Sequence, residues 1–120
     1  MPYVKGDIVW VPYENRDKKK LKHPAVIWEY SDDDTSFIGI MLTHAEPNGR
    51  FENILMKEDH FLSEHEVTFL NTHFVNQLFN KFQDWGPFYK AGRLTGEGIS
   101  FIEEHLKQAS PLNFDDYIKR

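Results

Sequence analysis

Two β-strand patterns near the N-terminus, separated by a polar loop, constrain the fold more than any other feature of this chain. In residues 5–11 (Lys-Gly-Asp-Ile-Val-Trp-Val), Ile8 and Trp10 are expected to face one way and Asp7, Val9 and Val11 the other, with the period of two that is typical of a strand. Residues 22–28 (Lys-His-Pro-Ala-Val-Ile-Trp) end in a run that is apolar on both faces. Such a run is typical of a central strand in a small closed sheet.

Further strand patterns follow along the chain and end in one helix. Strands are predicted at residues 37–42, 53–56, 66–71 and 88–94, the last with a bend or bulge at Gly92. Residues 72–79 fit either a longer strand or a short helix, because periodicity does not decide between them. From Thr95 the apolar residues recur near a period of 3.6, which predicts a helix that is capped by Thr95 and ends before Pro111. The pattern predicts a mainly β fold with a C-terminal α-helix, arranged as a small, curled, mostly antiparallel β-barrel.

The length of 120 residues and the lack of internal repeats or linkers predict a single domain over residues 1–120. We expect the barrel at about residues 3–94 and the helix at about residues 96–109. The tail, residues 111–120, carries several large apolar side chains, so we expect it to dock rather than to extend into solvent.

Composition excludes several classes of protein. The chain has no cysteine, which excludes disulfides and thiolate zinc sites and favours a cytoplasmic location. No run approaches the roughly 20 apolar residues of a membrane helix, so no membrane partner is expected. The net charge of -5 argues against a broad basic surface for nucleic acid. Any contact with RNA would therefore be local.

Polar residues of the kind that handle protons and phosphates stand at two strand ends. Lys22 and His23 come just before a proline at the start of one strand, and Thr43 and His44 follow the end of another. The loop before Lys22 is rich in lysine and arginine. It fits either a solvated loop tip or a mobile basic flap that closes over an anionic ligand.

Four segments together resemble the PemK/MazF family of bacterial toxin–antitoxin toxins. They are residues 6–11 (Gly-Asp-Ile-Val-Trp-Val), residues 23–27 (His-Pro-Ala-Val-Ile), the strand that ends in Thr43, and residues 91–95 (Ala-Gly-Arg-Leu-Thr) before the helix. The resemblance implies an SH3-like barrel, a homodimer, an antitoxin partner and a single-stranded RNA substrate. It also implies cleavage through a 2',3'-cyclic phosphate, with neither metal nor cofactor.

Carried over to this chain, the family's basic residue before Pro-Ala-Val falls on His23, where most members have arginine, and its hydroxyl residue falls on Thr43. RNA cleavage by the 2'-hydroxyl needs a base, an acid and a group that holds charge on the phosphate. Histidine can serve as base or acid near neutral pH. The predicted catalytic residues are His23, Thr43 and His44, and the predicted substrate-binding residues are Lys22, Arg16, Lys20 and Arg50.

Each of these assignments has a structural alternative. His23 fits a half-exposed edge residue bonded to a carbonyl, and Thr43 fits a residue that merely ends its strand. In an extended strand Thr43 and His44 point to opposite faces, so both share a site only if the strand ends at Thr43. The chain has six histidines, but the spacing of His60 and His65 matches no recognisable ligand pattern, and no metal site is predicted.

Three functions fit the sequence. The first is the endoribonuclease described above. The second is a non-catalytic SH3-like barrel that binds a protein partner or nucleic acid, which the acidic net charge and the missing arginine favour. The third is a structural dimer whose aromatic tail swaps between subunits.

Overall fold

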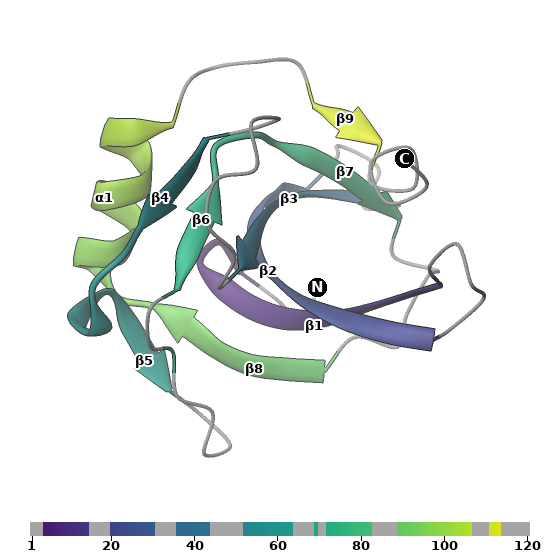
Figure 1. Cartoon of the computed structure of the whole chain (residues 1–120), viewed down its shortest axis with the longest axis horizontal. Coiled ribbons are helices and arrows are strands. Elements are labelled where there is room, and N and C mark those ends of the chain that lie inside the picture. The colour runs from purple at the N-terminus through teal and green to yellow at the C-terminus, as the bar shows by residue number, and fades with distance from the viewer. Residues whose placement is uncertain are drawn as a thin grey trace.

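The computed structural model describes residues 4–14, 20–30, 36–43, 52–63, 69, 72–82, 89–106 and 111–113, and it is mainly β with one α-helix near the C-terminus (Figure 1). The predicted fold class, mainly β with a C-terminal helix, is confirmed. The strands are β1 (Asp7–Glu14), β2 (Lys20–Tyr30), β3 (Ser36–Thr43), β4 (Asn53–Leu55), β5 (Phe61–Ser63), β6 (His73–Val75), β7 (Phe79–Phe82), β8 (Tyr89–Leu94) and β9 (Leu112–Asn113). The helices are the short 3-10 helix η1 (Glu58–His60) and the α-helix α1 (Gly96–His105).

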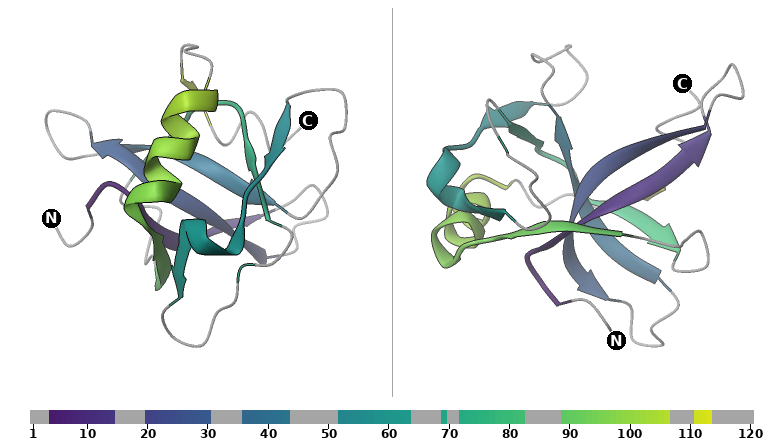
Figure 2. Two further views of the ribbon diagram at one scale, coloured as in Figure 1. Left: turned by 90° about the vertical axis from the view of Figure 1, so that its left-hand side faces the viewer. Right: turned by 90° about the horizontal axis from the view of Figure 1, so that it is seen from below.

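The described strands form one curled sheet. Its hydrogen-bonded order is β4-β6-β3-β2-β1-β8-β5, and neighbours along this path are antiparallel. β7 pairs with β3, and β9 pairs with β7 in parallel. The two end strands, β4 and β5, are separated only by residues 56–60, which span at most about 20 Å when extended. The ends of the sheet therefore curve towards each other, and Figure 2 shows the curvature from two sides.

One face of the central strands forms the main hydrophobic core. Ile8 of β1 lies opposite Val26 of β2, which lies opposite Ile40 of β3, and all three are fully buried. α1 covers this face through Ile102, which belongs to the same cluster (Figure 2). Burial of large aliphatic side chains of this kind contributes roughly 1.5–3 kcal/mol each to stability.

The opposite face of the central strands is buried as well. Val9, Ala25 and Met41 lie opposite one another and expose at most 3% of their surface. This confirms that residues 26–28 and 37–42 belong to strands covered on both faces, as their continuous apolar runs predict. It also confirms the alternation expected for the first strand.

Local chemistry sets the start and end of α1. The Thr95 side chain is the N-cap and accepts a hydrogen bond from the Gly98 N–H at 3.2 Å, as predicted. The same hydroxyl donates to the Asp59 carbonyl at 2.9 Å, which ties the helix start to η1. The helix ends at His105, earlier than the expected residue 109 and before Pro111.

Three other expectations have clear outcomes. The undecided segment 72–79 forms the strand β6, a bend and the start of β7 rather than a helix. The predicted bulge in β8 is confirmed, and its extra residue is Ala91, next to Gly92. The strand predicted at residues 66–71 lies outside the described residues, apart from Phe69.

The start of the C-terminal tail packs on the sheet. The Leu112 N–H donates to the Leu78 carbonyl at 3.0 Å as β9 joins β7. The Leu112 side chain itself is 40% exposed, and residues 114–120 lie outside the described part of the chain, so the docking expected for residues 111–120 stays a prediction. Within that described part, no helix is long and apolar enough to cross a bilayer.

Candidate functional site

His23 and Thr43 lie on the same face of neighbouring strands. β2 pairs with β3 as far as Ala25 opposite Met41, and His23 and Thr43 each lie two residues beyond that pair. A step of two residues keeps a side chain on the same face of a strand. Both side chains therefore lie on the face of Ala25 and Met41, away from the main core.

The same row of residues continues across the sheet to a second histidine. Thr43 lies directly opposite His73 of β6, and His73 lies opposite Leu55 of β4. We call His23, Thr43 and His73 the polar row. Adjacent strands are about 4.8 Å apart, so the two histidine backbones are separated by roughly 10 Å, with the threonine between them.

The polar row runs from a buried end to an exposed end. On β1, Val11 lies opposite His23 and exposes 1% of its surface, whereas Leu55 on β4 exposes 55%. The three members of the polar row are themselves half-buried. A ligand would therefore reach the row from the side of β4 and β6.

The surroundings of His23 favour its neutral imidazole, in which one ring nitrogen can accept a proton. Its Nδ1 lies 3.2 Å from the Pro24 carbonyl oxygen, and because a carbonyl can only accept, Nδ1 carries the proton of this hydrogen bond. In the neutral ring Nε2 is then unprotonated. Burial lowers the pKa of His23 below its ordinary value, and the bond to Pro24 opposes this only in part. A neutral imidazole suits a general base better than a phosphate-binding cation.

His73 was missed by the sequence analysis. Its Nδ1 is buried and has no hydrogen-bond partner in the described part of the protein. The signal in the sequence is the alternation around Phe74, which belongs to the main core and so sends His73 to the opposite face. That signal could be used only once residues 72–79 were known to be a strand.

Three of the other predicted site residues lie outside the described part of the chain, and two are described only as positions in a strand. Arg16, His44 and Arg50 lie outside the described residues. Lys20 and Lys22 belong to β2, but their side chains are not among those the structure describes. The roles assigned to these five residues remain predictions.

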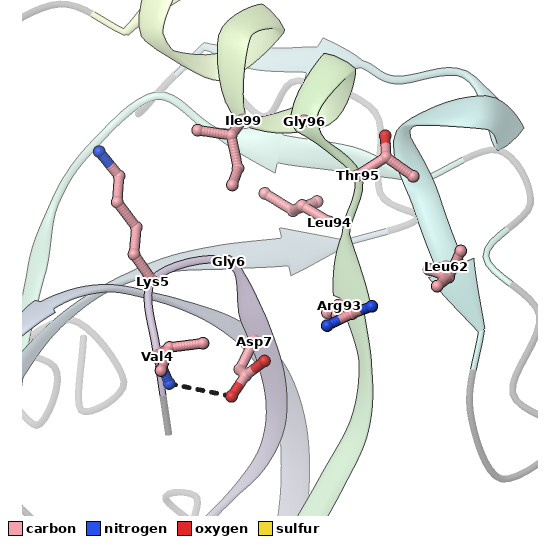
Figure 3. A pocket seen from close by; sticks show the side chains of 10 residues that line it. All are labelled: Val4, Lys5, Gly6, Asp7, Leu62, Arg93, Leu94, Thr95, Gly96 and Ile99. Carbon is pink, nitrogen blue, oxygen red and sulfur yellow. Dashed lines mark hydrogen bonds between the residues drawn. The ribbon is translucent and has the colours of Figure 1, made fainter. Parts of the chain in front are cut away.

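A pocket of about 350 Å³ lies elsewhere, where the start of β1 meets the end of β8 and the start of α1 (Figure 3). Lys5 and Arg93 contribute cationic side chains to its lining, and Asp7 contributes a carboxylate. The Asp7 carboxylate accepts a hydrogen bond from the Val4 N–H at 3.0 Å and pairs with the Lys90 ammonium at 3.5 Å. Its charge is thus satisfied within the protein.

This pocket is distinct from the polar row. Asp7 and Val11 are four residues apart on β1, which corresponds to about 13 Å along the strand. None of the predicted site residues lines the pocket. In addition, the Lys5 ammonium lies 3.7 Å from a Glu103 carboxylate oxygen and 4.3 Å from the centre of a Trp28 ring.

No family model, curated protein or solved structure matches this chain. Within the described ranges, no three histidine, aspartate or glutamate side chains gather in a way that would hold a metal ion.

Proposed function

We propose that this chain is a metal-independent endoribonuclease, a toxin-like member of the PemK/MazF group that cleaves single-stranded RNA. The observation that carries the proposal is the register of β2 and β3, which sets His23 and Thr43 on one face of neighbouring strands. The resemblance to the family points to these same two positions. We also propose that the protein is cytoplasmic, forms a homodimer and binds an antitoxin protein.

The chemistry follows from the state of His23. Its unprotonated Nε2 removes the proton from a ribose 2'-hydroxyl, and the 2'-oxygen attacks the adjacent phosphorus. The bond from phosphorus to the 5'-oxygen breaks, and that oxygen leaves after it takes a proton from an acid, for which His44 is the predicted donor. The products are a 2',3'-cyclic phosphate and a 5'-hydroxyl. Thr43 donates a hydrogen bond to a phosphate oxygen as charge develops.

Cationic side chains from the first loop support binding of the substrate in this proposal. Lys22, Lys20, Arg16 and Arg50 are the predicted contacts of neighbouring phosphates. Because positions 22 and 23 follow each other on β2, Lys22 belongs to the face of the strand opposite His23 and would contact a phosphate beside the polar row. Because His23 is held neutral, the positive charge at the site has to come from these residues.

The proposal is tested by incubating the protein with a single-stranded RNA in the presence of a chelator. We expect fragments that end in a 2',3'-cyclic phosphate, and a 2'-deoxy substitution at the cleaved position should abolish their formation. His23→Ala should lower the cleavage rate by roughly 10²–10⁴-fold, the usual contribution of a general base. His105→Ala is the matched control, because His105 is an exposed residue of α1, on the core side of the sheet.

Two results would contradict the proposal. RNA that stays intact over a wide pH range would exclude the nuclease, and stable binding of that intact RNA or of a protein would favour the non-catalytic barrel. Cleavage that survives His23→Ala unchanged would point to a contaminating nuclease or to another site.

A further inference from the structure

His73 is the member of the polar row that the proposed chemistry does not use. It lies directly opposite Thr43, and directly opposed residues of antiparallel strands have Cβ atoms about 4.5–5.5 Å apart. Both side chains therefore reach the same small volume above the sheet. His23 borders that volume on the other side of Thr43.

The surroundings of the His73 ring determine where its proton sits. Nδ1 is buried with no hydrogen-bond partner in the described part of the protein, while the residue as a whole is partly exposed. A buried N–H without an acceptor is rarer in proteins than a buried acceptor without a donor. In the favoured neutral tautomer, Nδ1 is therefore unprotonated and Nε2 carries the proton.

We propose that the Nε2–H of His73 donates a hydrogen bond to a non-bridging oxygen of an RNA phosphodiester that is bound at Thr43. This assignment rests on the proposed function and deepens it by naming a phosphate-binding residue that the sequence did not indicate. His73 and Thr43 supply two neighbouring donors to one phosphate. His23, as an acceptor on the far side of the threonine, faces the 2'-hydroxyl of the same nucleotide.

The exposed end of the row agrees with this placement. Leu55, opposite His73 on β4, is 55% exposed, so the sheet leaves the approach to His73 open on that side. Single-stranded RNA can thus lie across β4 and β6 with one phosphate over the polar row.

Two amide substitutions distinguish the contribution of Nε2 of His73 from that of Nδ1. The amide nitrogen of His73→Gln falls near the position of Nε2, whereas that of His73→Asn falls near Nδ1. The test measures binding of a short 2'-O-methyl oligoribonucleotide, which cannot be cleaved, by fluorescence anisotropy. We expect His73→Ala and His73→Asn to weaken binding by roughly 10- to 100-fold, as loss of a hydrogen bond to a charged acceptor does. His73→Gln should stay within about threefold of the wild type because the donor is retained.

His105→Gln is the matched control, since it replaces an exposed histidine on α1 and should leave binding unchanged. Equal losses in His73→Gln and His73→Asn, or wild-type affinity in His73→Ala, would overturn the proposal. A wild-type protein that binds the oligonucleotide but leaves RNA uncut would refute the nuclease while the role of His73 in binding still stands. A wild-type protein that cleaves RNA but does not bind the oligonucleotide would refute the role of His73 while the nuclease still stands.

A second measurement avoids substitutions that could impair folding. In ¹⁵N NMR spectra of the wild-type protein, the ring nitrogens of His73 should report the tautomer with the proton on Nε2. Addition of the 2'-O-methyl oligonucleotide should shift the Nε2 resonance more than those of His105. A tautomer with the proton on Nδ1, or a His73 signal that does not respond, would contradict the assignment.

Discussion

Gly98 of α1 packs directly against the main-chain carbonyl of His60 in η1. A Cβ atom added at Gly98 would overlap with that carbonyl oxygen, which also accepts a hydrogen bond from the Thr95 N–H at 2.9 Å. The absence of a side chain at this position therefore lets α1 begin beside η1. Through that contact the helix is held over the main core.

We predict that Gly98→Ala destabilises the fold by about 1–3 kcal/mol, because the added methyl group must push helix and η1 apart. Gly96→Ala is the control: a Cβ at Gly96 meets nothing within 4 Å, and the residue is exposed. Its effect should be neutral or slightly stabilising, by up to about 1 kcal/mol. Urea denaturation of both variants measures the difference, and equal free energies of unfolding would show that the contact with His60 is not tight.

The two ion pairs near the start of β1 should differ in their contribution to stability. Asp7 is 3% exposed, accepts a hydrogen bond from the Val4 N–H and pairs with Lys90. Asp7→Asn removes the negative charge that strengthens both of these interactions. We expect a loss of about 1–3 kcal/mol in the free energy of unfolding. The side chains of Lys5 and Glu103 are each about half exposed, so Glu103→Gln should cost less than about 0.5 kcal/mol. Thermal or urea unfolding compares the two, and a larger effect from Glu103→Gln would reverse this ranking.

The sequence predicted the parts of the fold that local pattern controls. The alternation of Ile8 with Val9, the continuous apolar runs of β2 and β3, and the cap at Thr95 all follow from short-range periodicity and capping chemistry. The pairing of β3 with β6 does not, because it joins residues about thirty positions apart through only two residue pairs, and the three-residue strand β6 leaves little pattern in the sequence. His73 was missed for that reason.

The site was predictable only as far as the short patterns around His23 and Thr43 reach. His23 was singled out because it precedes Pro-Ala-Val, and Thr43 because it ends a strand. Their common face follows from the β2–β3 register, which no single strand encodes. The direction of the pKa shift of His23 could not be predicted from the sequence either, because it depends on burial of His23 by other segments of the chain.

The lowered pKa of His23 should make stability depend on pH in a defined direction. The unfolded chain has a histidine pKa of about 6.5 and so binds more protons than the folded chain between that value and the lowered one. Stability from His23 is thus fully present above about pH 6.5 and is lost as the pH falls towards the folded pKa. His23→Gln should flatten this dependence. Urea unfolding from about pH 5 to about pH 8 tests this, and a steeper pH dependence in His23→Gln would contradict it.

Binding of single-stranded RNA should depend only weakly on salt. The chain carries a net charge of -5, and the proposed site holds one or two phosphates with few cations. For single strands the slope of log K against log salt is about -0.7 per neutralised phosphate, so for one or two phosphates we expect a slope of about -0.7 to -1.4. Lys22→Gln should reduce its magnitude by about 0.7 if Lys22 contacts a phosphate. Lys5→Gln should leave the slope unchanged, because Lys5 lies at the other end of β1 and pairs with Glu103. Anisotropy titrations over a range of salt concentrations measure both, and a slope steeper than about -4 would mean that RNA lies on a broader basic surface than the polar row provides.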